Sequence, residues 1–218
     1  IGLAMTIGKI LGDEDWDSYG CWVVFHWNGS AVRLLPESEF IEVRTNRNKN
    51  RITSEEQEGL VSKTVGIVGL SVGQAAAFTI AMERSAGTII IADFDDLELS
   101  NLNRIRAGIH ELGMPKWIVA ARSIAEVDPF INIVAYPEGI TEKNIDSFMS
   151  RCDVVVDACD GLSAKSMIRL EAMERNIPVI MDTSDRGMLD IERYDILTKE
   201  DGYLHGRIDH KTMSLCHI

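Results

Sequence analysis

Between residues 64 and 183, short apolar runs alternate with segments of helical spacing. The runs read TVGIVGL, TIIIADF, NIVAYPE, CDVVVDAC and IPVIMDT. Short runs rich in Val and Ile are typical of parallel strands that are buried on both faces. The intervening segments 72–86, 114–127 and 163–176 carry apolar residues at helical spacing, and Pro115 stands where a helix tolerates proline. This repetition predicts an α/β fold with a doubly wound, mostly parallel, Rossmann-like sheet.

The N-terminal third has a different pattern. The segment YGCWVVFHWNGSAVRLL places two β-prone runs on either side of Asn28-Gly29. This pair tolerates the positive φ angles of a tight turn, so the segment predicts a small β-hairpin. We expect its aromatic residues Trp22, Phe25 and Trp27 to form a small core of their own.

A capping signature follows the hairpin. Residues 37–51 are polar and are expected to be irregular or partly helical. Thr53-Ser54-Glu55-Glu56 then matches a capping box, which predicts a short helix ending near Ser62. We therefore expect three parts, which are an N-terminal helix and hairpin extension at 1–52, a nucleotide-binding domain at 53–195 and a C-terminal extension at 196–218.

Composition limits the class of protein. With 218 residues and 45% hydrophobic content, the chain can bury a core. A net charge of −12 disfavours nucleic acid as a partner, because a phosphate backbone would be repelled. The four cysteines are scattered without a C-x-x-C pair, which favours a reduced cytoplasmic setting. No apolar run approaches the ~20 residues that span a bilayer. The start lacks an initiator Met, and we expect a fragment of a longer protein that begins inside an amphipathic helix.

The first turn between a predicted strand and helix is rich in glycine. It reads Gly69-Leu70-Ser71-Val72-Gly73-Gln74. Glycine permits a tight turn, and the N-terminus of the helix offers free N–H groups to phosphate. Ser71 and Gln74 occupy the second and third glycine positions of G-x-G-x-x-G, so the motif is incomplete. A plain strand–turn–helix junction is the alternative.

The segment from Asp93 to Lys116 concentrates polar chemistry directly after the second predicted strand. Asp93 lies 24 residues after Gly69, close to the spacing of about 20 expected for a carboxylate on a ribose hydroxyl. The high density of acidic, amide and basic side chains in this segment indicates a site for a polyphosphate and its metal ion. The alternatives are a solvated carboxylate for Asp93 and a simple turn for Asp95 and Asp96. The candidate residues are Asp93, Asp95, Asn101, Arg104 and Lys116.

Three motifs carry a family resemblance. DFDDLELSNLNR, GMPK and VVVDACD resemble the core of the ubiquitin-activating-enzyme-like superfamily, in its ThiF and MoeB group, over residues 47 to 195. The resemblance implies an open parallel sheet. It also implies a homodimer that uses ATP and Mg²⁺ to adenylate a carboxylate, such as the C-terminus of a small carrier protein, with release of pyrophosphate.

The resemblance also implies roles for single residues. Asp93 would hold the ribose, and Asp160 would bind Mg²⁺. The glycine turn would contribute Gly69, Ser71 and Gly73, with Asp95 beside it. The phosphates would be contacted by Asn101, Arg104 and Lys116, and the catalytic set would be Arg104, Lys116 and Asp160. Arg47 or Arg51 would reach ATP from a basic segment, often across the dimer interface. The alternatives are a helix cap for Asp160 and a solvated basic stretch for the two arginines.

The chain also departs from the family pattern. Gly161 stands where the family usually has Asn, and the paired zinc motifs are absent. No cysteine lies between Cys159 and Cys216, where members that form thioesters carry a nucleophile. We expect Cys159 to be a buried small hydrophobe. The sequence therefore supports adenylation without a thioester step.

Other functions stay open. The chain resembles most closely a subset of the superfamily that has GLSVG at this turn. In that subset, the nucleotide-binding module precedes a nitroreductase-like domain within a larger protein. A nicotinamide-dependent oxidoreductase would use Gly69 and Asp93 but leaves Arg104, Asn101 and Lys116 without a role. The altered glycine loop would also suit a degenerate nucleotide-binding scaffold.

Overall fold

The structure is a computed structural model that describes residues 18–182, 189–197, 201–209 and 212. The chain divides into two compact units, Ile1–Arg51 and Ile52–Ile218. The N-terminal helix expected before the hairpin lies outside the described residues. None of the helices in the described residues is long and apolar enough to cross a lipid bilayer.

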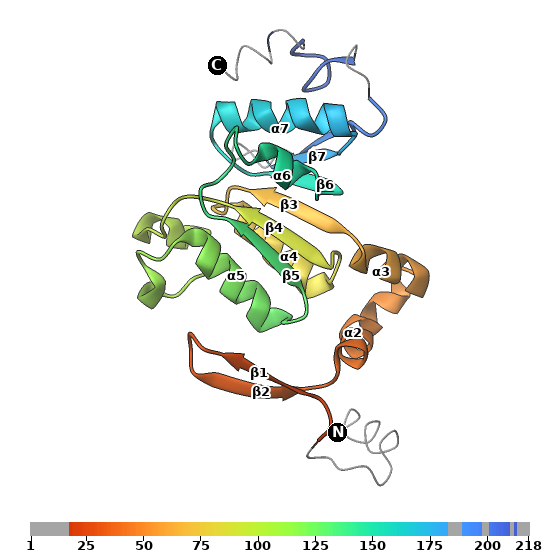
Figure 1. Cartoon of the computed structure of the whole chain (residues 1–218), viewed down its shortest axis with the longest axis vertical. Coiled ribbons are helices and arrows are strands. Elements are labelled where there is room, and N and C mark those ends of the chain that lie inside the picture. Colours follow the sequence, from red (N-terminus) through yellow and green to blue (C-terminus); the bar gives the residue numbers. More distant parts are fainter. Residues whose placement is uncertain (1–17, 183–188, 198–200, 210–211, 213–218) are drawn as a thin grey trace. The chain divides into compact units, whose positions relative to one another are not determined.

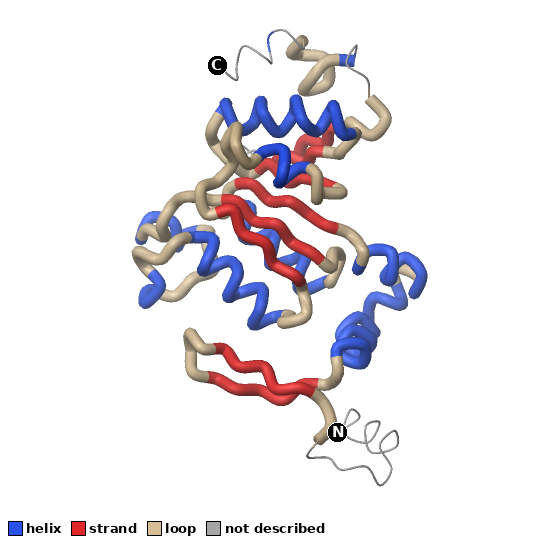
Figure 2. Tube along the Cα trace, viewed as in Figure 1, coloured by secondary structure: helices blue, strands red, loops and turns tan. Residues whose placement is uncertain are grey.

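The first unit contains the predicted hairpin (Figure 2). Strands β1 (Cys21–Phe25) and β2 (Ser30–Leu34) pair antiparallel. The tight turn was a wrong prediction, because the connection spans the four residues 26–29 and only Gly29 has a positive φ, of 71°. Asn28 instead accepts a hydrogen bond from the backbone N–H of Ser30, at 3.0 Å.

The expected aromatic core of the hairpin forms only in part, because Trp22 does not join it. Phe25 is buried and packs edge-on against Trp27, with ring centroids 5.4 Å apart. Trp22 lies three residues before Phe25 and so points to the other face of the ribbon, where it is 66% exposed beneath the Arg33 guanidinium. After the hairpin, α2 (Glu37–Thr45) and the 3₁₀ helix η1 (Asn46–Asn50) show that the polar segment is mostly helical.

The second unit is built on a six-stranded sheet with the order β5-β4-β3-β6-β7-β8. The first five strands in chain order are parallel, and β8 pairs antiparallel with β7. The strands are β3 (Thr64–Val68), β4 (Thr88–Ala92), β5 (Asn132–Tyr136), β6 (Val154–Asp157), β7 (Val179–Asp182) and β8 (Leu189–Glu192). The predicted doubly wound, mostly parallel sheet is confirmed. The pattern did not predict β8, because LDIE alternates in burial instead of forming a continuous apolar run.

Helices flank this sheet. They are α3 (Ser54–Val61), α4 (Gly73–Glu83), α5 (Lys116–Val127), α6 (Ile145–Met149) and α7 (Leu162–Arg175), with the 3₁₀ helices η2 (Leu99–Asn103) and η3 (Ile109–Glu111). The capping box that opens α3 is confirmed, since Thr53 and Glu56 exchange two hydrogen bonds of 2.8 and 3.1 Å. Helix α7 ends at Asn176 in the left-handed conformation, as its place in the sequence suggested.

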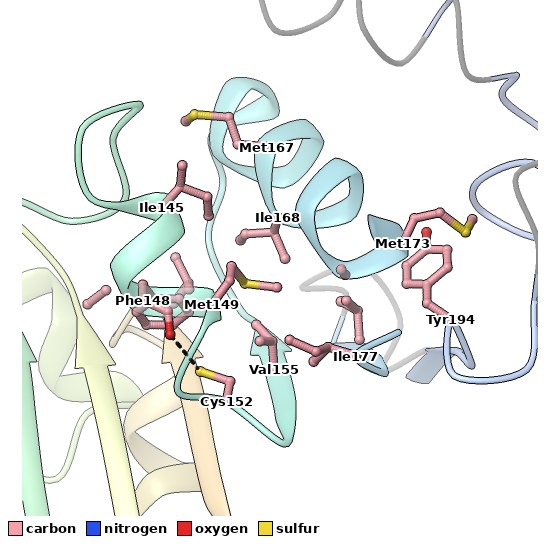
Figure 3. Close-up of a cluster of buried hydrophobic side chains, with 14 of the residues drawn as sticks. Ile145, Phe148, Met149, Cys152, Val155, Met167, Ile168, Met173, Ile177 and Tyr194 are labelled. Atoms are coloured by element: carbon pink, nitrogen blue, oxygen red, sulfur yellow. Dashed lines mark hydrogen bonds between the residues drawn. The ribbon is translucent and has the colours of Figure 1, made fainter. Parts of the chain in front are cut away.

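Two buried clusters hold the layers together. On one face, α4 and α5 pack on Ile67, Ile89 and Ile91 of the central strands. On the other face, α6 and α7 bury Phe148 and Ile168 with the residues shown in Figure 3. Residues of β3 and β4 belong to both clusters, so these two strands are buried on both faces, and Figure 1 shows them between β5 and β6.

The strand order reverses direction beside β3. The chain runs from β3 to β4 and β5 on one side, then crosses to β6 and β7 on the other. Ligands of open α/β sheets bind at such a switch point, outside the carboxyl ends of the strands. The fold therefore directs attention to the loops after β3, β4 and β6.

Candidate nucleotide-binding site

A cavity of about 170 Å³ opens at this switch point. It brings together five of the residues singled out in the sequence, because three separate strands end at its wall. They are Gly69 and Ser71 after β3, Asp93 and Asp95 after β4, and Asp160 after β6. The remaining lining residues are Val68, Ala92, Phe94, Gly139, Ile140, Ala158, Cys159, Gly161 and Ala164.

The glycine turn is required by close packing. Gly69 has a φ of 87°, and a Cβ atom there would lie 2.5 Å from the carbonyl oxygen of Ala158. A Cβ atom on Gly73 would lie 2.7 Å from a methyl group of Ile67, so this glycine lets α4 approach β3. Helix α4 then begins without a side-chain cap, which leaves N–H groups at its N-terminus available to an anion.

Gln74 gives the altered motif a structural explanation. It stands at the third glycine position and is buried. Its amide donates to the Arg106 carbonyl at 3.1 Å and accepts from the Arg106 N–H at 2.9 Å. Sequence reasoning missed this contact, because it joins the helix to a loop 32 residues away. The departure from glycine therefore anchors the polar segment beside the site.

Asp93 is buried, with 7% of its surface exposed, so the alternative of a solvated carboxylate is wrong. One carboxylate oxygen accepts from the Leu70 N–H at 2.6 Å, and the other accepts from the Asp95 N–H at 2.8 Å. Asp93 thus joins the glycine turn to the loop after β4. Because a carboxylate oxygen has two lone pairs, each oxygen can accept one further hydrogen bond, including one from a ribose hydroxyl.

The segment after Asp93 closes on itself. The Lys116 N–H donates to the Asp95 carbonyl at 2.9 Å, and the Leu97 N–H donates to the Met114 carbonyl at 2.7 Å. A small apolar cluster built on Leu97, Ile105 and Val119 fills the interior of this excursion. Lys116 is buried, and its ammonium lies 2.8 Å from the Asp95 carboxylate, which places its charge beside the cavity.

Asn101 and Arg104 lie farther along this segment, and neither is among the cavity-lining residues. Asn101 is buried and accepts from the Glu98 N–H at 3.0 Å, which caps η2. Arg104 is exposed, and its guanidinium donates to the Asn103 side chain at 2.9 Å. The structure therefore brings the five lining residues together, with Lys116 beside them, but leaves Asn101 and Arg104 outside the wall.

Asp160 is exposed and has no hydrogen-bond or ion-pair partner among the described residues. Helix α7 starts with Gly161 at the N-cap and no side-chain cap, so the alternative that Asp160 caps this helix is wrong. An unpaired carboxylate fits a hard cation such as Mg²⁺, which prefers oxygen ligands. No group of three or more His, Cys, Asp or Glu in the described parts of the chain forms a metal site. A cation on Asp160 would therefore take its other ligands from nucleotide phosphates and water.

The profile of the ThiF family matches residues 44–186, the part of the chain that holds this cavity. The chain belongs to the ThiF family. The ThiF core thus accounts for the resemblance that the three motifs carried, and for the sheet whose strand ends form the site.

The chain is also similar to individual proteins, two in sequence and one in fold. An uncharacterized protein of Mycobacterium tuberculosis is 44% identical over 80% of this chain and 24% of its own length. The sulfur carrier protein ThiS adenylyltransferase of Escherichia coli is 31% identical over 57% of this chain and 50% of its own length. The crystal structure of an E. coli tRNA N6-threonylcarbamoyladenosine dehydratase in complex with ATP aligns with a TM-score of 0.63 and 24% identity, over 68% of this chain and 62% of that one. The chain thus spans half or less of these two curated relatives.

Cys159 differs from the expected buried hydrophobe. It is partly buried in the wall of the ThiF site, and its thiol donates to the Asp157 carboxylate at 3.1 Å. Burial and the negative charge of Asp157 raise the pKa of Cys159 to about 12. The thiol is therefore protonated near neutral pH and is a poor nucleophile. Cys216 lies outside the described residues.

The basic segment belongs to the first unit. Arg47 lies in η1 and Arg51 directly follows it, and both side chains are exposed there. Its part in the ThiF site, assigned from the family resemblance, stays a prediction.

Proposed function

We propose that the chain catalyses ATP-dependent adenylation of a carboxylate. The observation that supports this most directly is the unpaired Asp160 carboxylate, which shares one cavity with the glycine turn and Asp93. Cation binding, phosphate approach and ribose recognition each need one of these three elements. One relative of the chain is named as an adenylyltransferase of the sulfur carrier protein ThiS, which is the same type of reaction.

In the proposed reaction, a carboxylate oxygen of the substrate attacks the α-phosphorus of ATP. The bond from that phosphorus to the bridging oxygen breaks, which yields an acyl-adenylate and pyrophosphate. No general base is needed, because the nucleophile is already ionised. Catalysis then depends on orienting the reactants and on neutralising charge at the phosphates.

Residues of this chain would divide these tasks. Asp93 holds the ribose, and the N-terminus of α4 with Ser71 and Gly73 receives phosphate oxygens. Lys116 neutralises phosphate charge, and the family resemblance assigns the same task to Arg104 and a phosphate contact to Asn101, although both lie outside the cavity wall. Mg²⁺, when bound, would neutralise negative charge on the phosphates, and Asp160 is the residue that would hold it. Arg51 or Arg47 would reach the nucleotide from its own chain or across a homodimer.

The acyl substrate is the finer part of the proposal. A small carrier protein with a free C-terminal carboxylate fits the resemblance and the printed role of the ThiS relative. We also propose that the chain acts as an activating module of a larger protein that contains a nitroreductase-like domain. The mycobacterial relative supports a larger protein, because the alignment covers 24% of it.

Pyrophosphate exchange with candidate carboxylates tests the reaction, and calorimetry of ATP with Mg²⁺ tests the site when the substrate is unknown. Asp160→Ala is expected to lower Mg-ATP affinity at least tenfold. Asp146→Ala is the matched control, because Asp146 is an exposed carboxylate on α6 whose partner Arg175 lies outside the cavity. If Asp160→Ala binds Mg-ATP and catalyses pyrophosphate exchange like the wild type, the assignment of Asp160 as the Mg²⁺ ligand is refuted.

Two other outcomes would replace the proposal. Tight binding of NAD without binding of ATP would make the chain a nicotinamide-dependent protein that uses Gly69 and Asp93. Binding of neither nucleotide would favour a scaffold role, in line with the incomplete glycine motif.

A further inference from the structure

A buried network of charged side chains lies behind the wall of the cavity. Asp157, the last residue of β6, accepts from Lys165 at 3.0 Å and from Arg169 at 2.7 Å, both on α7. The same Arg169 guanidinium donates through Nε to Glu192 on β8, at 2.7 Å. Arg169 is 2% exposed at its side chain, and the two carboxylates are at most 1% exposed. One arginine therefore joins two buried acids on two different strands.

The inner end of this network holds the loop that carries Asp160. Asp157 also contacts Cys159, whose backbone N–H and thiol donate to it at 3.3 and 3.1 Å. The next residue along the chain is Asp160, and Ala158 to Gly161 all line the cavity. The Asp157 carboxylate thus contacts the segment that forms this part of the wall.

The outer end of the network holds a strained turn. Glu192 accepts from the Tyr194 hydroxyl and from the Leu204 N–H, the latter at 2.7 Å. Leu204 and His205 both adopt left-handed backbone angles, with φ of 51° and 56°. A residue with a side chain pays roughly 1 kcal/mol or more for this conformation and keeps it only when surrounding contacts hold it. Glu192 supplies one such contact, and the His205 ring lies 2.6 Å from Asp190, which supplies another.

We propose that Arg169 is a positioning residue for the nucleotide site. Through Asp157 it sets the loop that carries Asp160, and through Glu192 it couples that loop to the turn around Leu204. The two acids and the two bases of the network balance, so removing Arg169 leaves two buried carboxylates with one partly exposed lysine. Breaking a buried ion pair in this way is costly and displaces the groups that it held. The role toward the nucleotide rests on the proposed function, whereas the coupling itself does not.

Hydrogen exchange measured by mass spectrometry tests the coupling without any ligand. In Arg169→Met, amides of residues 158–161 are expected to exchange about tenfold faster than in the wild type. Arg84→Met is the matched control, because Arg84 forms an equally buried ion pair with Asp128, and neither lines the cavity. It should leave exchange at 158–161 unchanged. Glu192→Gln, which removes only the outer acid, should also accelerate exchange at 158–161.

Calorimetry tests the consequence for binding. Arg169→Met and Glu192→Gln are expected to weaken Mg-ATP about 10- to 100-fold, as loss of outer partners does at metal sites. They should change the affinity for ATP without Mg²⁺ far less, a selectivity that general destabilisation would not produce. Arg84→Met should bind both forms like the wild type.

The outcomes separate the two hypotheses. A wild-type protein that binds no Mg-ATP would refute the proposed function, and hydrogen exchange would still decide the coupling. Wild-type binding, combined with unchanged exchange and unchanged Mg²⁺ selectivity in folded Arg169→Met, would overturn the positioning role. If Arg169→Met does not fold, Glu192→Gln decides in the same way.

Discussion

The ammonium of Lys116 lies 2.8 Å from the carboxylate of Asp95, at the edge of the cavity that Asp95 lines. The two residues are 21 positions apart and meet because the segment between them closes on itself. The ion pair holds the buried Lys116 side chain next to the place where phosphate charge would lie.

Lys116→Ala is therefore expected to slow ATP–pyrophosphate exchange by about 100-fold or more, the usual cost of removing one group that stabilises developing charge. Lys63→Ala is the control, since Lys63 forms a 2.9 Å pair with Asp153 and both are largely exposed. It should leave exchange unchanged. Equal exchange rates for Lys116→Ala and the wild type would refute the role of Lys116 in the nucleotide site.

Gly69→Ala is expected to destabilise the second unit by about 2 kcal/mol or more, because its φ is 87° and the new methyl group would meet the Ala158 carbonyl oxygen. Gly59→Ala should instead increase the stability of the second unit. Gly59 lies inside α3 with open space around it, so alanine should stabilise the helix by about 0.5–1 kcal/mol. Urea unfolding of both variants measures this, and equal stabilities would contradict the packing argument.

Asp157 should make the free energy of unfolding depend on pH in the acidic range. Burial acts to raise its pKa, but Arg169 and Lys165 outweigh burial and hold the pKa of Asp157 below its ordinary value of 3.8. A carboxyl with a lowered pKa contributes stability above its unfolded pKa, and the contribution is lost as pH falls through the folded pKa. Asp157→Asn should thus be less stable than the wild type by about 3 kcal/mol at pH 7, since it breaks a buried ion pair.

Urea unfolding across pH gives the check. The difference between Asp157→Asn and the wild type should stay constant down to about pH 4, since the ordinary pKa is 3.8, and shrink below that. A difference that grows as pH falls would show that the pKa of Asp157 is raised instead.

Cys159→Ala is expected to retain pyrophosphate exchange within about twofold, because a thiol with a pKa of about 12 does not supply a thiolate near neutral pH. Mass spectrometry after incubation with ATP and an active carboxylate substrate should find no thioester on Cys159. A covalent adduct there would show that thioester chemistry occurs in this chain after all.

Local patterns were sufficient for much of the fold. The continuous Val and Ile runs predicted the five parallel strands, because burial on both faces removes polar residues from the sequence itself. The capping box at Thr53 and the left-handed Asn176 were readable for the same reason, since each depends on a few adjacent residues. The spacing from Gly69 to Asp93 predicted that two strand ends would share one site, and the cavity contains both.

Contacts between polar groups that are distant in the sequence could not be predicted from the sequence. Gln74 pairs with Arg106, and Arg169 joins Asp157 to Glu192 on a strand that the pattern did not predict. In sequence each of these residues looks like an ordinary surface group, because a charge tolerates burial only when a partner from another element meets it.

The sequence by itself thus determined the layered α/β fold, the glycine turn and the acids that follow the strands, since each is encoded in neighbouring residues. Only the tertiary structure decided which of those polar groups face the cavity, which are locked in pairs, and that Asp160 has no partner among the described residues. The physical reason is that burial and charge pairing are properties of the packed chain, whereas periodicity and capping belong to the segment alone.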